Sequence, residues 1–249
     1  MLVDGYNQRE TTFLRINADG QLYISSKEPK EGYVEYKSKT GNISYRKTYQ
    51  GIMGKLSRVI IKEIEYDGSK AKFVMMFIDD GNENFAIVMP LFTQKGGLNS
   101  YVKSFVRYYR NIDITKDLVI APMARKKDEK YAPGGFWINY VNDEGKPGEL
   151  VKQYFKRDQN GWPDLEKETS ITGEVKWSSA KQDKFAYERF MEYIKEMDEK
   201  RGKGDGHDNS AASNKPSSEV EGKKEAPSTA ATTAPSQPDF GEDNDDLPF

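Results

Sequence analysis

Aromatic and basic side chains are interleaved in three segments of the chain, a combination that can hold a single nucleic-acid strand. The segments are Tyr45-Arg46-Lys47-Thr48-Tyr49, Arg107-Tyr108-Tyr109-Arg110 and the stretch from Arg125 to Tyr131. Cations along a groove pair with phosphates, and exposed rings stack on bases of any sequence. The candidate strand-binding residues are therefore Tyr45, Arg46, Lys47, Tyr49, Arg107, Arg110, Arg125, Lys126, Lys127, Lys130, Tyr131 and Trp137.

These clusters also have simpler explanations. Tyr101, Phe105 and Tyr108 have the spacing of a buried helix face, and groups of Lys and Arg are common in solvated loops. Trp137 alternates with apolar neighbours and shares its strand face with Asn139. Because successive side chains of a strand point to opposite faces, this alternation predicts that the indole lies on the more solvated side.

Catalytic chemistry has few candidates. The chain has no cysteine and its one histidine is His207, which excludes thiol nucleophiles, Cys or His zinc sites and Ser-His-Asp triads. Asp79, Asp80 and Glu83 could hold Mg²⁺ in a nuclease, but Asp80-Gly81-Asn82 between two strands is better explained as a hairpin turn. Gly51-x-x-Gly54-Lys55 lacks the frame of a phosphate-binding loop. We expect no catalytic residue, no metal site and no cofactor.

Charge is divided unevenly along the chain. The formal net charge is -2, yet residues 201–249 hold 5 Lys and Arg against 10 Asp and Glu, while residues 1–200 hold 33 against 30. The first 200 residues also contain 28 of the 30 aromatic residues. Residues 201–238 are rich in Gly, Ser, Ala, Thr and Pro and have no periodicity, which predicts a disordered linker. One folded body, 1–200, is therefore expected to precede an acidic tail.

The tail ends in an acidic tip, residues 239–249, whose last five residues are Asp245-Asp246-Leu247-Pro248-Phe249. Acidic tails often serve only solubility, but that role does not require Leu, Pro and Phe at the end. Phe249 would offer its ring and a carboxylate to an apolar pocket beside a Lys or Arg, while Pro248 limits the entropy lost on binding. Asp245, Asp246, Leu247, Pro248 and Phe249 are thus the candidate partner-docking residues.

This tip closely resembles the C-terminal tip of bacterial and bacteriophage single-stranded DNA-binding proteins (SSBs), and a divergent bacteriophage-type SSB is the closer likeness. The specific likeness covers about ten residues and the character of the linker. Leu247 replaces the isoleucine usual in that tip, and the body is longer than the compact domain of bacterial SSB. The resemblance implies an oligonucleotide-binding (OB) domain that coats single-stranded DNA, and a tip that recruits replication, recombination and repair enzymes.

The body is predicted to be mainly β, because short runs of β-branched and aromatic residues are separated by Gly, Asn and Asp turns. A long first strand kinked near Gly54 and a helix between the third and fourth strands favour a five-stranded OB-fold-like barrel with extra N-terminal hairpins. A β-sandwich, or a twisted sheet with a helix on one face, would give a similar pattern. The expected hairpins are 12–16 with 21–25 and 33–37 with 43–49; the expected barrel strands are 51–66, 72–79, 84–91, 118–124 and 135–141.

Two helices are predicted, over about 98–109 and about 180–200. Ser179-Ala180-Lys181-Gln182 matches a capping box at the start of the second helix, and one face carries Tyr187, Phe190, Met191, Ile194 and Met197. Residues 142–178 are turn-rich and receive no assignment. The N-terminus MLVDGYNQRE has no apolar signal region, and no segment approaches the roughly 18 apolar residues of a membrane span. A cytoplasmic protein without a membrane partner is expected.

Together these patterns favour a non-enzymatic protein that coats and protects exposed single-stranded DNA and recruits DNA-processing enzymes through its tip. Strand annealing or recombination mediation is a closely related function that the same patterns allow. Two less favoured functions are a metal-dependent nuclease and an adaptor that docks through its tip without touching nucleic acid. The acidic tail can occupy the same basic surface as DNA, so its removal is expected to strengthen strand binding.

Overall fold

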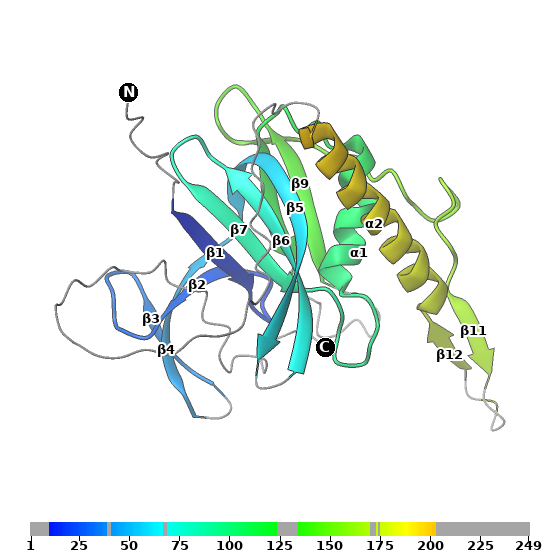
Figure 1. Ribbon diagram of the computed structural model, residues 1–249, viewed down its shortest axis with the longest axis horizontal. Coiled ribbons are helices and arrows are strands. Elements are labelled where there is room, and N and C mark those ends of the chain that lie inside the picture. The colour runs from blue at the N-terminus through cyan, green and yellow to red at the C-terminus, as the bar shows by residue number, and fades with distance from the viewer. Residues whose placement is uncertain are drawn as a thin grey trace, which may run out of the picture.

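The computed structural model of the chain describes residues 10–38, 41–66, 69–123, 134–169, 173 and 175–202. The described part is mainly β, as predicted, with helices on one side of the sheet (Figure 1). Its strands are β1 (Thr11–Ile16), β2 (Leu22–Ser26), β3 (Val34–Lys37), β4 (Ile43–Tyr49), β5 (Ile52–Tyr66), β6 (Ser69–Asp79), β7 (Asn84–Pro90), β8 (Leu118–Met123), β9 (Gly135–Val141), β10 (Pro147–Leu150), β11 (Glu166–Thr169) and β12 (Val175–Ser178). The helices are α1 (Ser100–Tyr108), the 3-10 turn η1 (Tyr109–Asn111) and α2 (Ala180–Gly202).

Ten of the described strands form one mixed sheet, in the order β10-β9-β8-β5-β6-β7-β1-β2-β4-β3, and β11 pairs only with β12. The five strands expected to form a barrel, β5 to β9, are thus consecutive neighbours within a larger sheet. The reason lies at β7, whose outer edge pairs in parallel with β1, with Thr12 opposite Phe85 and Leu14 opposite Ile87. The N-terminal hairpins therefore continue the sheet beyond β7.

The local strand pairs agree with the sequence prediction. The β1–β2 and β3–β4 hairpins are antiparallel, and β5, β6 and β7 form an antiparallel meander. The described connections β1–β2, β3–β4 and β6–β7 are short, and each carries a glycine with positive φ (Gly20, Gly41 and Gly81), which favours a hairpin over a longer crossover. All of these expected strand pairs are confirmed.

Gly54 lies where the long strand β5 changes its neighbour. Residues Ile52–Gly54 pair with β8, and β5 pairs with β6 from Lys55 onward. Gly54 has φ +150°, and a Cβ at this position would approach the backbone oxygen of Asp79 to 2.6 Å. Only glycine accommodates both the backbone angle and the close approach. The glycine that the sequence suggested as a kink therefore marks the point where β5 passes from one neighbour to another.

The core lies between the sheet and the two helices. α1 buries Tyr101, Val102, Phe105, Val106 and Tyr108, which confirms the predicted core face, and Asn99 caps the helix by accepting a hydrogen bond from the Tyr101 N–H at 2.9 Å. The sheet residues of this core lie on alternating positions: Leu56, Val59, Ile78, Ile87, Leu118, Ile120, Phe136 and Ile138.

α2 covers α1 with most of the predicted face: Phe190 and Met197 are buried, and Tyr187 and Ile194 are half-buried against the core. Its buried side chains are Ala186, Phe190, Tyr193 and Met197, whereas Met191, predicted to be on the apolar face, is 39% exposed. Tyr193, which was not assigned to that face, is buried because its ring packs on those of Phe105 and Tyr109, with centroids 5.6 and 4.7 Å apart. Contacts between aromatic rings stabilise the burial of Tyr193, and Met191 is left exposed.

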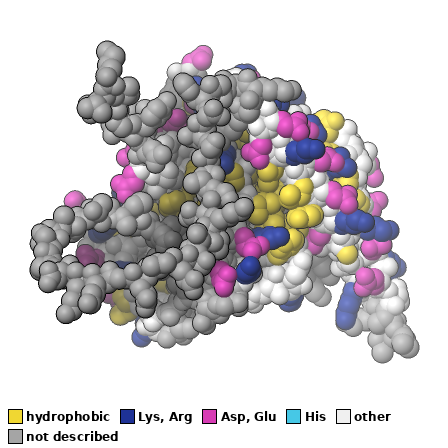
Figure 2. Space-filling model, in the orientation of Figure 1, with side chains coloured by type: hydrophobic (Ala, Val, Ile, Leu, Met, Phe, Trp, Pro, Cys, Tyr) yellow, Lys and Arg dark blue, Asp and Glu magenta, His cyan; other side chains and the backbone are white. Residues whose placement is uncertain are grey.

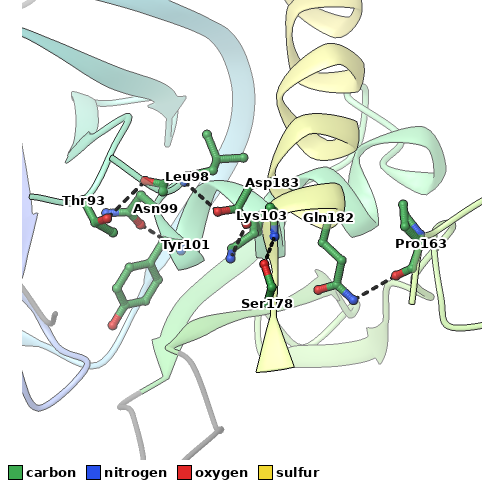
Figure 3. A network of polar contacts seen from close by, with 11 residues as sticks. Thr93, Leu98, Asn99, Tyr101, Lys103, Pro163, Ser178, Gln182 and Asp183 are labelled. Carbon is green, nitrogen blue, oxygen red and sulfur yellow. Dashed lines mark hydrogen bonds and ion pairs between the residues drawn. The ribbon is translucent and has the colours of Figure 1, made fainter. Parts of the chain in front are cut away.

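The start of α2 is fixed by a polar network rather than by the predicted capping box (Figure 3). The Gln182 amide does not reach back to Ser179; it donates to the Pro163 carbonyl at 2.9 Å. The Ser178 hydroxyl accepts from the Ala180 N–H at 3.3 Å. The Asp183 carboxylate accepts from the Leu98 N–H at 3.1 Å and pairs with the Lys103 ammonium at 2.7 Å. The helix is thereby tied to the loop before α1.

The turn-rich segment 142–178 contributes β10, β11 and β12 and three core residues, Val151, Phe155 and Trp162. Helix α2 continues to Gly202, two residues past the expected boundary. Residues 203–249, which include the remainder of the predicted linker and the whole tip, lie outside the described residues.

Candidate nucleic-acid interface

Trp137 projects from β9 on the side opposite the core. Its neighbours in the strand, Phe136 and Ile138, are fully buried, and the Phe136 ring packs on Tyr101 of α1 with centroids 5.3 Å apart. Trp137 itself is 50% exposed. The predicted orientation of the indole is therefore confirmed, and a ring fixed on a paired strand presents a flat face to solvent.

Small neighbours leave the Trp137 ring uncovered. In the register between β8 and β9, Ala121 lies directly opposite Trp137, and Val119 lies opposite Asn139 on the same face. On the other side, the Asn139 amide donates to the Gly148 carbonyl of β10 at 3.0 Å. Leu150 of β10 lies opposite Asn139 on this face, but Ala121 is too small to cover an indole and Trp137 stays half-exposed, so a flat ligand can approach the ring.

Helix α1 holds the ends of β8 and β9 in place. The Tyr101 hydroxyl donates to the Met123 carbonyl at 3.2 Å, and the Ser104 hydroxyl accepts from the Phe136 N–H at 2.9 Å. Burial raises the pKa of the Tyr101 phenol to about 12, which keeps this donor protonated. Gly134 leaves room for the Tyr101 hydroxyl next to β9, because a Cβ at position 134 would lie only 2.8 Å from that hydroxyl.

The segment between these two strand ends carries the densest group of predicted cations. Arg125, Lys126, Lys127, Lys130 and Tyr131 fall within residues 124–133, which lie outside the described residues. The strand ends that flank them, Met123 and Gly135, are directly paired, and Trp137 follows two residues after Gly135. The described part therefore sets the base of this segment next to the exposed ring.

The aromatic and basic residues of β4 are divided between the two faces of the sheet. Tyr45, Lys47 and Tyr49 share one face; Lys47 is exposed, the two tyrosines are half-buried, and the Lys47 ammonium lies 5.6 Å from the Tyr49 ring centroid. Arg46 points to the other face and is only 6% exposed. Arg46 was predicted to contact a nucleic-acid strand, which requires an exposed side chain. Its burial contradicts that prediction.

Arg46 is held between two rings of the protein itself. Its guanidinium carbon lies 3.3 Å from the ring centroid of Tyr36 and 4.4 Å from that of Tyr23. A planar cation between two π faces is well stabilised away from water. At Arg46, the combination of basic and aromatic residues therefore serves packing between β2, β3 and β4.

Arg107 and Arg110 are also engaged within the protein. Arg107 is half-buried with its guanidinium carbon 4.4 Å from the Trp162 ring, and burial lowers the pKa of that guanidinium. Arg110 forms a two-pronged ion pair with Glu196 of α2, at 2.8 and 3.0 Å. Figure 2 shows basic and acidic side chains interspersed over α2 on this side of the molecule. Arg107 thus packs on Trp162 and Arg110 pairs with α2, while strand contacts at these two arginines stay a prediction.

The acidic cluster forms a turn, as expected. Asp80 accepts from the N–H groups of Asn82 and Glu83 at 2.8 and 2.7 Å, and Asp79 accepts from the Gly81 N–H at 2.8 Å. Among the described residues, no three His, Cys, Asp or Glu side chains gather as a metal site requires. The nuclease hypothesis therefore has no geometric support in this turn.

A cavity of about 680 Å³ opens beside this turn. Its wall combines Tyr49, Phe85 and other apolar side chains with the carboxylates of Asp80, Glu83 and Asp117, and none of the described residues that line it is basic. A phosphate backbone would be repelled by these carboxylates. The cavity is a poor match for the predicted ligand, in contrast to the Trp137 face.

One exposed ring was not among the predicted site residues. Trp177 of β12 is 50% exposed, as much as Trp137. The alternation of Val175-Lys176-Trp177-Ser178 is a strand signal, but it is only four residues long and lies in a turn-rich segment, so it did not stand out.

Comparison of the chain with protein-family models, with curated protein sequences and with solved structures finds no match. No helix among the described residues has both the length and the apolar character needed to cross a membrane.

Proposed function

We propose that the protein binds single-stranded DNA, coats and protects exposed strands during replication, recombination and repair, and is not an enzyme. The observation that carries this proposal is Trp137, a half-exposed ring on a paired strand at the base of the segment that contains Arg125, Lys126, Lys127 and Lys130. Stacking on such a ring is tolerant of sequence, and the cations that follow β8 in the sequence suit the phosphates.

The strand order gives the proposal secondary support. Strands β9-β8-β5-β6-β7 are consecutive in the sheet, β5 pairs with both β6 and β8, and α1 lies between β7 and β8 in the chain. We propose that these five strands are an OB-like unit extended by the N-terminal hairpins. In an OB fold, the connection between the fourth and fifth strands is a binding loop, and here it corresponds to residues 124–133.

The tail supplies the second half of the proposal. Asp245, Asp246, Leu247, Pro248 and Phe249 form an acidic peptide with an apolar end, which suits a basic-rimmed apolar pocket on another protein. We propose that this tip recruits replication, recombination or repair enzymes to the coated strand. An adaptor would share this tip but lack the strand-binding surface, so the two functions differ in one measurable property.

Titration of intrinsic Trp fluorescence with oligo(dT) at low and high salt tests the proposal. Stacking on an exposed indole should quench its emission. Binding releases salt cations condensed on the phosphates, so a higher salt concentration should weaken the affinity. Trp137→Ala should weaken the affinity by about 5- to 150-fold, the range for one lost stacked base. A wild-type protein that gives no response selects the adaptor, and Mg²⁺-dependent cleavage that is lost in Asp79→Ala selects the nuclease.

A further inference from the structure

The β11–β12 hairpin is a second structure that presents an exposed tryptophan. It projects from the body at the start of α2 (Figure 1), and its two strands pair only with each other. A two-stranded hairpin has little core of its own, so large apolar residues on it are unusual unless they contact something. Three of them are present: Leu165 just before β11, and Val175 and Trp177 on β12, which are 42%, 42% and 50% exposed.

These apolar side chains lie on one face of the hairpin. The register places Lys167 opposite Trp177 and Thr169 opposite Val175. Leu165 precedes Lys167 by two positions, so alternation along the strand assigns it to the same face. The other face carries Glu166, Glu168, Lys176 and Ser178. The hairpin is therefore amphipathic although its apolar face has no sheet packed on it.

The charges of the two faces differ in a way that favours an anionic ligand. On the polar face, Glu166 pairs with Lys181 of α2 at 2.8 Å and Glu168 lies directly opposite Lys176, so the charges are matched. On the apolar face, Lys167 lies opposite an indole instead of a carboxylate. An ammonium beside an exposed ring is the pairing that a nucleotide requires, with its base on the ring and its phosphate on the cation.

The base of the hairpin is rigidly attached. On one side, the Gln182 amide donates to the Pro163 carbonyl at 2.9 Å (Figure 3). Next to it, Trp162 is 6% exposed and packs edge-on to Phe185 of α2, with centroids 5.8 Å apart. On the other side, β12 passes directly into α2 after Ser178. A ring on a fixed support loses little entropy when it binds a flat ligand.

The three tryptophans of the chain thus fall into two classes. Trp162 is buried under Arg107 and Phe185 and has a packing role. Trp137 and Trp177 are each 50% exposed, each points outward from a paired strand, and each belongs to a different sheet. Tryptophan is highly buried on average and is enriched at interfaces, so these two half-exposed rings are candidate contact sites.

We propose that the β11–β12 hairpin is a second contact for single-stranded nucleic acid, in which Trp177 stacks on a base and Lys167 pairs with an adjacent phosphate. This inference rests on the proposed function, since it takes the same ligand class. It extends that function, because a strand long enough to reach both Trp137 and Trp177 binds at two separate rings. Short strands occupy one ring and long strands occupy both.

The test measures affinity by fluorescence anisotropy for labelled oligo(dT) of about 8 and about 40 nucleotides, lengths within and well above the roughly 4–16 nucleotides that one OB unit spans. Trp177→Ala should weaken binding of the long oligonucleotide by about 5- to 150-fold and the short one much less. Lys167→Gln should reduce the slope of log K against log salt by about 0.7. Trp177→Phe should bind like the wild type, whereas Trp177→Leu should bind like Trp177→Ala.

Val175→Ala is the matched control, because it removes exposed apolar surface from the same face without removing a ring. An unchanged affinity for the long strand in Trp177→Ala, with a loss in Trp137→Ala, overturns the inference and leaves the proposed function standing. A wild-type protein that binds neither oligonucleotide overturns both. If Trp177→Leu binds the long oligonucleotide as well as Trp177→Phe does, the face is apolar but does not stack on bases. If the wild type is a dimer that Trp177→Ala dissociates, the face binds a second copy of the chain. Either result assigns the face to a protein partner and overturns the inference.

Discussion

Replacing Asp183 by alanine should loosen the junction between the two helices. The Asp183 carboxylate is the only described side chain that binds both the Leu98 N–H and the Lys103 ammonium, at 3.1 and 2.7 Å. Removing it leaves a backbone donor and a cation without their partner in a site where the Lys103 and Asp183 side chains are only 21% and 18% exposed. We expect a large loss of stability from a single side chain.

The magnitude follows from these contacts. Breaking a fully buried ion pair costs about 3–5 kcal/mol, and the remaining exposure reduces that figure because water reaches the stranded ammonium. A hydrogen bond to a charged group contributes about 1.5–3 kcal/mol, part of which is already included in the pair. Asp183→Ala should therefore lower the free energy of unfolding by about 3 kcal/mol.

Urea unfolding followed by circular dichroism measures this change. Asp198→Ala is the control: it removes a carboxylate from an exposed position of the same helix, and it should cost no more than about 0.5 kcal/mol. In the double variant with Lys103→Met, the loss should be smaller than the sum of the two single losses, since no charge is stranded. Equal costs for Asp183→Ala and Asp198→Ala, or additive losses in the double variant, would refute the reasoning.

Three further results are expected. Deleting residues 240–249 should strengthen oligo(dT) binding at low salt and abolish pull-down of partner enzymes; unchanged binding to both would defeat the role given to the tip. Gly135→Ala should cost about 1–3 kcal/mol in urea unfolding, because its Cβ would lie 2.8 Å from the Ser104 hydroxyl, and adding Ser104→Ala should recover part of this loss. Because burial raises the pKa of Tyr101 to about 12, the stability that its neutral phenol provides should be complete below pH of about 10 and decline as the pH rises to about 12. A decline equally steep in Tyr101→Phe would contradict this.

Local features of the fold were predictable because short-range chemistry determines them. The turn at Asp80-Gly81-Asn82 forms hydrogen bonds between its own side chains and backbone, so no distant residue is needed to define it. The same holds for α1, whose apolar spacing and Asn99 cap are local. Gly54 could be identified as a bend from its place in a long strand, although its close approach to Asp79 could not.

Long-range pairing was not predictable from periodicity. The parallel pairing of β1 with β7 joins Thr12 to Phe85, and nothing in either strand specifies the other as a neighbour. This one pairing converts the expected five-strand unit into part of a ten-stranded sheet. The one wrong assignment on the predicted face of α2, the exposed Met191, has a related cause: which side chains are buried depends on where Tyr193 contacts other rings, and that is a tertiary property.

Arginine beside tyrosine was the most ambiguous signal in the sequence. A guanidinium stacks on a protein ring as readily as a base does, so the pattern around Arg46 is equally suited to packing and to binding. The structure resolves the ambiguity through strand pairing: Tyr23 and Tyr36 flank Arg46 from adjacent strands. Trp137 gave the clearer signal, because alternation alone determines which face of a strand is solvated.

Charge then limits where a strand can bind. The acidic residues Asp80, Glu83 and Asp117 border the cavity of about 680 Å³, and a phosphate 4 Å from one of them is repelled by about 1 kcal/mol in water and more where water is excluded. The slight excess of 33 basic over 30 acidic residues in 1–200 therefore understates how uneven the surface is. Carboxylates gather at the cavity, whereas Arg125, Lys126, Lys127 and Lys130 follow β8 in the sequence, and the described end of β8 pairs with β9 near Trp137. Under the proposed function we therefore expect a strand to cross the outer face of β8 and β9 at the end where Trp137 lies, away from the cavity at Val141.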